Sequence, residues 1–254
     1  MQRIAMVLEY DGRGLCGWQR QDNGPTVQEY LETALARIEG KPVHSHAAGR
    51  TDAGVHAEAM LVHTDVSEDR SCHSPKAYVH GVNQYLPGQI RVLDMRAVSR
   101  AFHARFDCRE RAYRYQIWNR TTAPAIHRWR HWWMPRPLDL PMMQQAAQYL
   151  TGRHDFSSFR ASGCQASSPI RELHELRIER HGVCVELHFR ANAFLYHMVR
   201  NIVGSLVRVG IGKWPSERIP ELLSAKDRTL AADTAPAWGL YFTHAVYDNF
   251  DYPE

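Results

Sequence analysis

The segment Gly49-Arg50-Thr51-Asp52-Ala53-Gly54 places a carboxylate and a guanidinium on a short loop between two glycines. Glycine lets the backbone turn sharply and lie close to a ligand, and a loop held between two strands presents its side chains in a fixed pose. Asp52 is therefore a candidate for nucleophilic or acid–base chemistry. The alternative is a simple turn in which Asp52 only accepts nearby N–H groups, as turn aspartates often do.

Four histidines lie close to this loop in the sequence, His44, His46, His56 and His63. Imidazole and carboxylate groups together bind zinc, but zinc sites usually show close ligand spacings such as HExxH or CxxC. Neither spacing occurs here, and we predict no metal site. A metal hydrolase that uses these histidines is the weaker alternative, and full activity in the presence of a chelator would exclude it.

A second cluster lies in residues 192–204, NAFLYHMVRNIVG. Apolar residues recur at helical spacing, which predicts a long helix over Phe194–Val209 with a buried stripe. Arg200 lies off that stripe. A buried arginine needs a carboxylate partner, and Asp52 is one possible partner.

A third cluster, residues 105–115, reads RFDCRERAYRY. Arginines interleaved with aromatic residues are typical of a surface that binds phosphates and stacks on bases. A half-exposed strand with Tyr113 and Tyr115 pointing inward explains the pattern equally well.

The composition narrows the class of protein. The 254 residues are 44% hydrophobic and 23% charged, which excludes a coiled coil, a collagen-like repeat and a mostly disordered chain. Of the 31 basic residues, all but four are arginines, and the formal net charge is +4. Arginine suits phosphates and base stacking, so an RNA partner is plausible, although a GC-rich genome explains the same bias.

The cysteines and the hydropathy pattern favour a soluble cytosolic protein. The chain has no CxxC pair and an odd number of cysteines, five in all, which fits reduced thiols better than a disulfide framework. They are Cys16, Cys72, Cys108, Cys164 and Cys184. No apolar stretch approaches the roughly 20 residues of a membrane span.

Strand and helix patterns alternate along the chain, which predicts the α+β class with a mostly antiparallel or mixed sheet. Thr26 and Glu29 have capping-box spacing before a helix that Gly40 ends. His181-Gly182 joins two strands as a hairpin. The other expected elements are strands over residues 4–10, 60–66 and 111–119, a helix over 141–150 capped by Asp139, and a short helix after Pro215-Ser216. We expect two similar halves, residues 1–104 and 105–254.

Taken together, the motifs resemble those of the tRNA pseudouridine synthase A family nearly from end to end. The most specific of them is Ala48-Gly49-Arg50-Thr51-Asp52-Ala53-Gly54-Val55-His56. The others, in order, are Glu9–Gly12, Gly17–Gln21, Val27-Gln28, Gly81–Asn83 with Leu86-Pro87, Phe102–Phe106, Tyr113–Tyr115, Asp155-Phe156, Ser158–Arg160, Asn192–Gly204 and Ala225–Arg228. Two departures are small: Leu15-Cys16 stands where the family usually has an aromatic residue, and Cys108 where it usually has alanine.

The resemblance implies a role for each candidate residue. Asp52 would be the catalytic aspartate, and Arg50 would help to open the RNA helix and hold the flipped nucleotide. Tyr113 would pack on the uracil, and Arg200 would pair with Asp52. The first half, residues 1–104, would carry the aspartate loop, and the second would complete the active-site cleft.

The resemblance also implies the reaction and the assembly. Uridine at positions 38, 39 and 40 of the tRNA anticodon stem-loop would become pseudouridine, with no cofactor and no metal. The uracil must leave C1′ at N1, turn, and rejoin through C5 without being released. The family fold has two similar halves around a central, mostly antiparallel sheet flanked by helices, and it forms a cytoplasmic homodimer. The alternative function is a non-catalytic tRNA-binding protein or chaperone, and normal turnover by Asp52→Asn would argue against the catalytic assignment.

Overall fold

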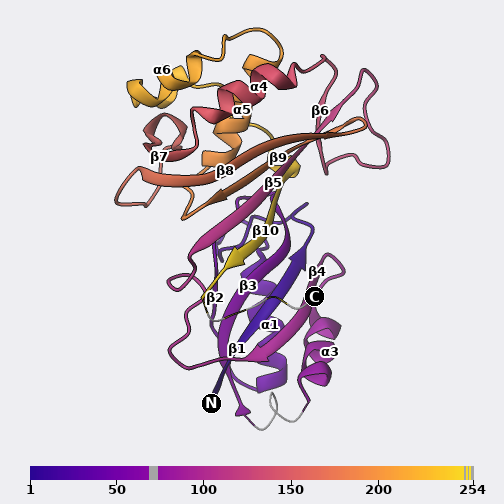
Figure 1. The fold of residues 1–254 in the computed structure, drawn as a ribbon. Helices are drawn as coiled ribbons and strands as arrows, with labels where there is room; N and C mark the ends of the chain where they lie inside the picture. The colour runs from indigo at the N-terminus through magenta and orange to yellow at the C-terminus, as the bar shows by residue number, and fades with distance from the viewer. Residues whose placement is uncertain (69–73, 249, 251, 253–254) are drawn as a thin grey trace. The chain divides into compact units, whose positions relative to one another are not determined.

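The computed structural model describes residues 1–68, 74–248, 250 and 252, and Cys72 lies outside this described part. The chain forms two units, residues 1–111 with 242–254 and residues 112–241 (Figure 1). The division at residues 104 and 105 that the sequence suggests stays a prediction. None of the helices in the described part of the chain is long and apolar enough to cross a membrane.

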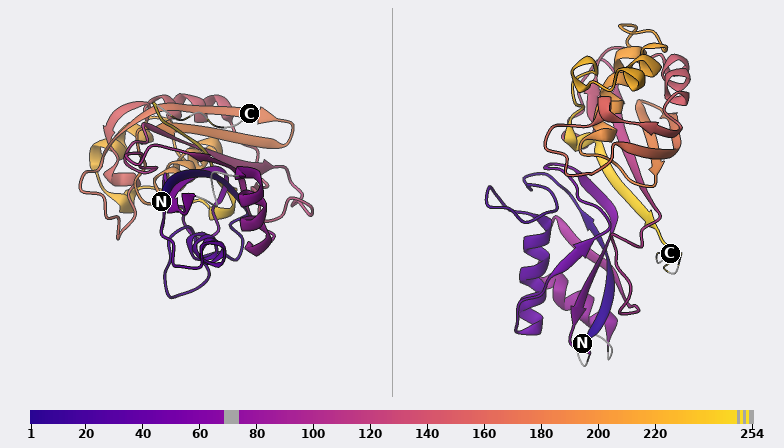
Figure 2. Two further views of the ribbon diagram at one scale, coloured as in Figure 1. Left: turned by 90° about the horizontal axis from the view of Figure 1, so that it is seen from below. Right: turned by 90° about the vertical axis from the view of Figure 1, so that its left-hand side faces the viewer.

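The described part of the first unit contains mostly antiparallel strands and two helices. Its strands follow the order β4-β1-β3-β10, and β2 pairs with β3. The helices pack against each other and lie on one face of these strands (Figure 2). The elements are β1 (Gln2–Tyr10), α1 (Val27–Glu39), β2 (Ser45–Ala47), β3 (His56–Val66), α3 (Pro75–Tyr85), β4 (Ile90–Ala97) and β10 (Leu240–Val246), the last beginning in the second unit.

The second unit has strands in the order β5-β9-β8-β7, with β6 parallel to β5. Helix α4 packs against α5 and β8. The elements are β5 (Glu110–Asn119, beginning in the first unit), β6 (Trp132–Met134), α4 (Leu140–Gln148), β7 (Gly152–Asp155), β8 (Ile170–His181), β9 (Cys184–Ala191), α5 (Met198–Gly210) and α6 (Arg218–Ala225), together with 3-10 turns at Ser157–Phe159, Arg228–Leu230 and Ala237–Gly239. The α+β class with mostly antiparallel strands is confirmed.

Local signals in the sequence explain several element boundaries. The Thr26 hydroxyl accepts the N–H of Glu29 at 3.3 Å, and α1 ends where Gly40 adopts a left-handed φ of 72°. The Asp139 carboxylate likewise accepts the Met142 N–H at the start of α4. These caps satisfy backbone groups that a helix end leaves unpaired.

The starts of β3 and α5 each differ from the expectation by four residues, since β3 begins at His56 and not at residue 60. Helix α5 begins at Met198, whereas the apolar spacing predicts a start at Phe194. The reason is His197, whose left-handed φ of 60° interrupts the helical backbone. The stripe from Met198 through Leu206 is buried as expected, but Phe194 lies in the preceding loop.

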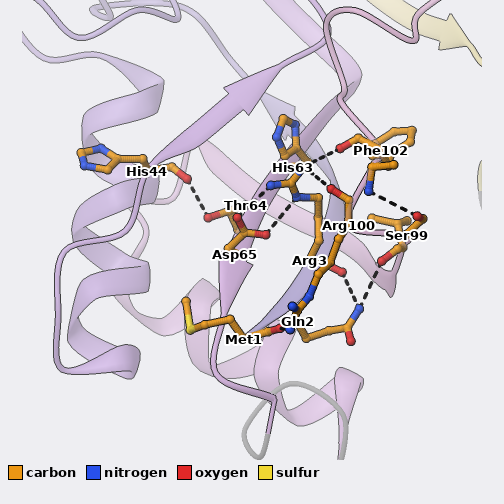
Figure 3. A network of polar contacts seen from close by, with 12 residues as sticks. Met1, Gln2, Arg3, His44, His63, Thr64, Asp65, Ser99, Arg100 and Phe102 are labelled. Atoms are coloured by element: carbon orange, nitrogen blue, oxygen red, sulfur yellow. Dashed lines mark hydrogen bonds and ion pairs between the residues drawn. The ribbon is translucent and has the colours of Figure 1, made fainter.

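A guanidinium links three segments of the first unit (Figure 3). Arg3 on β1 donates to both carboxylate oxygens of Asp65 on β3, each at 2.9 Å, and lowers the pKa of that carboxyl. The same side chain donates to the carbonyls of Arg100 and Phe102 at 2.7 and 3.0 Å. Arg3 therefore fixes the segment after β4 beside the strands, and that segment leads to residues near the candidate site.

Candidate functional site

The loop that carries Asp52 connects β2 and β3, as the sequence predicts. The Asp52 carbonyl accepts the N–H of Val55 at 3.1 Å, which closes a tight turn. At the start of the loop, the Ala48 N–H donates to the carbonyl of Leu61 on β3 at 2.8 Å. Asp52 is also half-buried. Because of the hydrogen-bonded turn and this burial, its carboxylate lies in a constrained turn and not in a free surface loop.

Residues 10–18 clamp this loop from one side. The buried Thr51 hydroxyl shares a hydrogen bond of 2.8 Å with the Tyr10 hydroxyl, and the Thr51 carbonyl accepts the Trp18 N–H at 3.1 Å. On the other side of Asp52, the Gly54 N–H donates to the Leu15 carbonyl at 3.2 Å. The residues that flank Asp52 are thus fixed by backbone and side-chain bonds.

Two glycines allow residues 10–18 to approach the aspartate loop so closely. A Cβ on Gly12 would collide with the carbonyl oxygen of Val55, and one on Gly17 with the carbonyl oxygen of Thr51. Gly17 also has a left-handed φ of 84°, which disfavours any residue with a side chain. The sequence showed these positions only as a glycine-rich loop, and their role in holding the aspartate loop was not predicted.

Arg50 is exposed beside Asp52, with a second guanidinium nearby. Partial burial of its guanidinium and the charge of Arg105 both lower the pKa of Arg50. Arginine remains protonated at physiological pH. Two positive groups therefore lie close enough to interact, an arrangement that suits a phosphate.

Arg111 braces the two segments that carry these guanidiniums. Its Nε donates to the carbonyl of Ala48 at 3.0 Å, and its Nη2 to the carbonyl of Arg105 at 2.7 Å. Its Nη1 donates to the carbonyl of Cys108 at 3.2 Å. Sequence reasoning placed Arg111 only at the start of an alternating strand, so this positioning role was missed.

The histidines near the loop make contacts of their own. The ring of His63 stacks on His46 with centroids 5.0 Å apart and meets His103 at 4.5 Å. Its Nδ1 accepts the Ala104 N–H at 3.1 Å, and burial is the main cause that lowers its pKa to about 4. Nδ1 of His56 accepts the N–H of a loop glycine at 3.1 Å. Within residues 1–68, 74–248, 250 and 252, no three His, Cys, Asp or Glu side chains are arranged to hold a metal ion.

Tyr113 lies on β5 in the second unit. Its side chain is 9% exposed, and its ring meets the edge of Phe194 with centroids 5.0 Å apart. Tyr115 is fully buried, donates its hydroxyl to the Pro236 carbonyl at 2.8 Å, and has a pKa raised well above its ordinary value by burial. Both tyrosines point inward, as the alternative interpretation of this strand describes.

Arg200 lies in the first turns of α5 and is half-buried. Its Nε donates to the Ala235 carbonyl at 2.8 Å, and the Ala235 N–H donates back to the Arg200 carbonyl at 3.1 Å. Its charge opposes the rise in the pKa of Tyr115, so the two side chains lie near each other. Arg200 is therefore held by α5 and by the segment that leads to β10.

The next residue, Asn201, fixes α5 in the second unit. Its fully buried amide oxygen accepts from Arg228 at 3.0 Å and Thr234 at 2.7 Å, and its amide nitrogen donates to the Phe159 carbonyl at 2.8 Å. Sequence reasoning did not single out Asn201. The signal for it is a polar residue beside the buried stripe, because a buried amide must find partners.

The candidate residues thus fall into two groups. Arg50 and Asp52 share one loop of the first unit, whereas Tyr113 and Arg200 belong to the second unit. The pairing of Arg200 with Asp52 stays a prediction, as do the roles of all four residues.

Comparison with known proteins assigns these features to a family. A family model described as tRNA pseudouridine synthase matches residues 6–107 and 146–248. Three relatives, each called tRNA pseudouridine synthase A, are 48% identical to this chain. Those from Rhodospirillum rubrum, Nitrosomonas europaea and Thiobacillus denitrificans align over 95%, 97% and 100% of this chain and 86%, 89% and 97% of their own.

The chain belongs to the tRNA pseudouridine synthase family. This membership confirms the resemblance seen in the sequence and, with it, the expectation of an enzyme that isomerises uridine to pseudouridine. One of the solved structures similar to this chain is a Cbf5-Nop10-Gar1 complex, which is 11% identical over 94% of this chain and 48% of that chain. The TM-score of 0.39 is too low for this likeness to indicate a function.

Proposed function

We propose that this protein converts uridine to pseudouridine at positions 38, 39 and 40 of the tRNA anticodon stem-loop. The observation that carries the proposal is the family match over both parts of the chain, with the aspartate loop inside the first matched segment. The clamped geometry of that loop supports it, because catalysis needs a carboxylate held in a fixed position. The reaction rearranges atoms already present in the uridine and requires no redox cofactor.

Asp52 is the catalytic carboxylate in this proposal. Arg50 enters the opened RNA helix and holds the flipped nucleotide, for which its exposed guanidinium beside Arg105 is suited. Tyr113 packs on the detached uracil, since an aromatic face holds a turning base without fixed hydrogen bonds. Arg200 pairs with Asp52 and orients its carboxylate.

The assembly and location complete the proposal. The protein acts on tRNA in the cytoplasm as a homodimer. Sedimentation of the purified chain at assay concentration tests the dimer, and a single species of monomer mass would contradict it.

Tritium release tests the activity. The wild type is incubated, with chelator and no cofactor, with tRNA that carries tritium at uridine C5, because rejoining through C5 displaces that hydrogen to water. We expect release by the wild type and none by Asp52→Asn. Asp22→Asn is the matched control, since Asp22 is an exposed aspartate of the same unit.

The outcomes separate the two classes of function. Release that persists undiminished in Asp52→Asn would overturn the role of Asp52. A wild type that binds tRNA but releases no tritium would favour the non-catalytic binding protein instead.

A further inference from the structure

Phe106 is a large aromatic side chain that the proposed chemistry leaves unused. It is 77% exposed, although most large apolar side chains of its unit are buried. It lies in the arginine- and aromatic-rich segment 105–115, in the part of that segment that belongs to the first unit. Aromatic side chains are enriched at interaction surfaces relative to the rest of a protein surface.

The turn that carries Phe106 is rigid. The Asp107 carboxylate accepts the His103 N–H at 2.7 Å, and the His103 carbonyl accepts the Asp107 N–H at 3.0 Å. Nδ1 of His103 lies 3.2 and 3.3 Å from the backbone nitrogens of Arg105 and Phe106. A side chain on such a turn is already ordered before a ligand arrives, so binding costs less conformational entropy.

One face of the Phe106 ring is covered. The His103 imidazole stacks on it with centroids 4.2 Å apart and planes 28° from parallel. The remaining ring surface accounts for the high exposure. The pair presents a flat, supported aromatic surface of the kind on which nucleobases stack.

The position of this surface relative to the aspartate loop is fixed by Arg111. That guanidinium holds the Arg105 carbonyl at 2.7 Å and the Ala48 carbonyl at 3.0 Å, so the residue before Phe106 is tied to the start of the loop that carries Asp52. Arg105 directly precedes Phe106 in the chain, and its guanidinium lies close enough to that of Arg50 to interact with it. The aromatic surface therefore lies within a positively charged region that suits an RNA backbone.

We propose that Phe106 is a stacking platform for a nucleobase of the tRNA anticodon stem-loop, with Arg105 contacting the neighbouring phosphate. The inference rests on the proposed function, because it names a further substrate contact of the same site. Flipping the target uridine unstacks its neighbours. An aromatic face next to the aspartate loop restores stacking to one of the displaced bases.

Four variants at position 106 test the platform, with one control variant elsewhere in the same unit. We expect Phe106→Ala to raise Kd and KM for tRNA roughly five- to 150-fold, the range for loss of one stacked base, with kcat within about twofold. Phe106→Trp and Phe106→Tyr keep a ring and should retain affinity. Phe106→Leu keeps apolar bulk without a π face and should behave like alanine. Leu93→Ala is the control, because Leu93 is 50% exposed in the same unit.

The salt dependence of tRNA binding distinguishes base stacking by Phe106 from a phosphate contact by Arg105. Arg105→Ala should flatten the slope of log K against log salt by about 0.7 to 0.9, the loss of one phosphate contact. Phe106→Ala should weaken binding at every salt concentration and leave the slope unchanged. Sedimentation of Phe106→Ala should match the wild type.

Wild-type Kd and KM in Phe106→Ala would overturn the proposal, as would full affinity in Phe106→Leu or a changed oligomeric state in Phe106→Ala. The binding titration is independent of turnover. A wild type without tritium release would contradict the proposed function, while the titration would still decide whether Phe106 stacks on RNA.

Discussion

Tyr10 and Thr51 share a buried hydroxyl–hydroxyl hydrogen bond of 2.8 Å, and Thr51 immediately precedes Asp52. The bond joins the end of β1 to the loop that carries the candidate carboxylate. The position of Asp52 thus depends on residues about 40 positions earlier in the chain, which form no part of its own loop.

Tyr10→Phe removes this bond and keeps the ring. Because a buried hydroxyl loses its partner, we expect the free energy of unfolding to fall by about 1 kcal/mol. Urea denaturation measures the change, and kcat should fall more than KM rises. Tyr85→Phe, at a 48% exposed position, is the control and should match the wild type. An equally stable Tyr10→Phe would show that the bond does not hold the loop.

Gly17→Ala introduces a Cβ against the Thr51 carbonyl at a left-handed φ of 84°. Backbone strain and overpacking together should cost about 3 kcal/mol, with a large loss of tritium release. Gly14→Ala provides a matched comparison, since Gly14 has a φ of 74° and no atom within 4 Å of an added Cβ. Gly14→Ala should add only the backbone strain, which should lower the free energy of unfolding by about 1 kcal/mol. Equal losses in thermal unfolding would show that the close approach is unimportant.

Asn201→Ala leaves the partners of a fully buried amide unsatisfied. We expect the free energy of unfolding to fall by about 2 to 3 kcal/mol. Asn192 is exposed, and its amide oxygen also accepts two backbone N–H groups. Asn192→Ala should therefore lower the free energy of unfolding by less. Denaturant titration of both variants gives the comparison, and the reverse order would contradict the role of Asn201 in fixing α5.

Arg200→Ala separates a catalytic effect from a binding effect. If Arg200 orients Asp52, single-turnover rates of bound tRNA should fall at least tenfold, while Kd for tRNA changes little. Arg208→Ala is a control on the same helix, where Arg208 pairs with the exposed Asp233 at 3.0 Å. Weakened binding with a normal single-turnover rate in Arg200→Ala would contradict the pairing.

His63 makes stability depend on pH in acid. Its pKa is lowered to about 4, mainly by burial and then by the neighbouring charges of His103, His46 and Arg3, against the opposing effect of Asp65. The unfolded chain, with an ordinary pKa near 6.5, therefore binds more protons between pH 6.5 and 4. Stability is unaffected above this window and falls as pH drops through it, by up to about 3 kcal/mol.

The His63→Gln variant tests the sign and the window. Its free energy of unfolding, measured by denaturant titration from pH 7.5 to 4, should fall less steeply with acid than that of the wild type. His80→Gln, at an exposed position, is the control and should keep the wild-type slope. Parallel curves for wild type and His63→Gln would assign the acid sensitivity to other groups.

Features set by neighbouring residues were predictable from the sequence. Thr26 and Gly40 delimit α1, and β8 and β9 form the predicted hairpin. Its turn is Gly182-Val183, one residue later than the predicted His181-Gly182, because His181 still pairs with Cys184 in the ladder. Along β9, buried side chains alternate with half-buried or exposed ones as expected. Each depends on contacts within a few residues, which spacing alone reveals.

Features set by distant contacts were not predictable. Residues 194–197, which the apolar spacing places in a helix, are not helical because His197 adopts a left-handed backbone. No apolar pattern indicates this conformation. Arg111 contacts carbonyls both near and more than 60 residues away, and its sequence context shows only a strand. The aspartate was identifiable because its glycine-bounded motif is local, whereas the clamp around it consists of long-range bonds.

The first unit is built from two separated stretches of chain, and this affects the order in which it forms during translation. Its last strand, β10, is followed by Tyr247, which donates to the Ala104 carbonyl at 2.6 Å, and by Asp248, which pairs with Arg109 at 2.7 Å. A ribosome makes residues 1–111 first, then the whole second unit, and only then these partners. The unit with the aspartate loop therefore acquires its final strand only after all of the second unit has been synthesised.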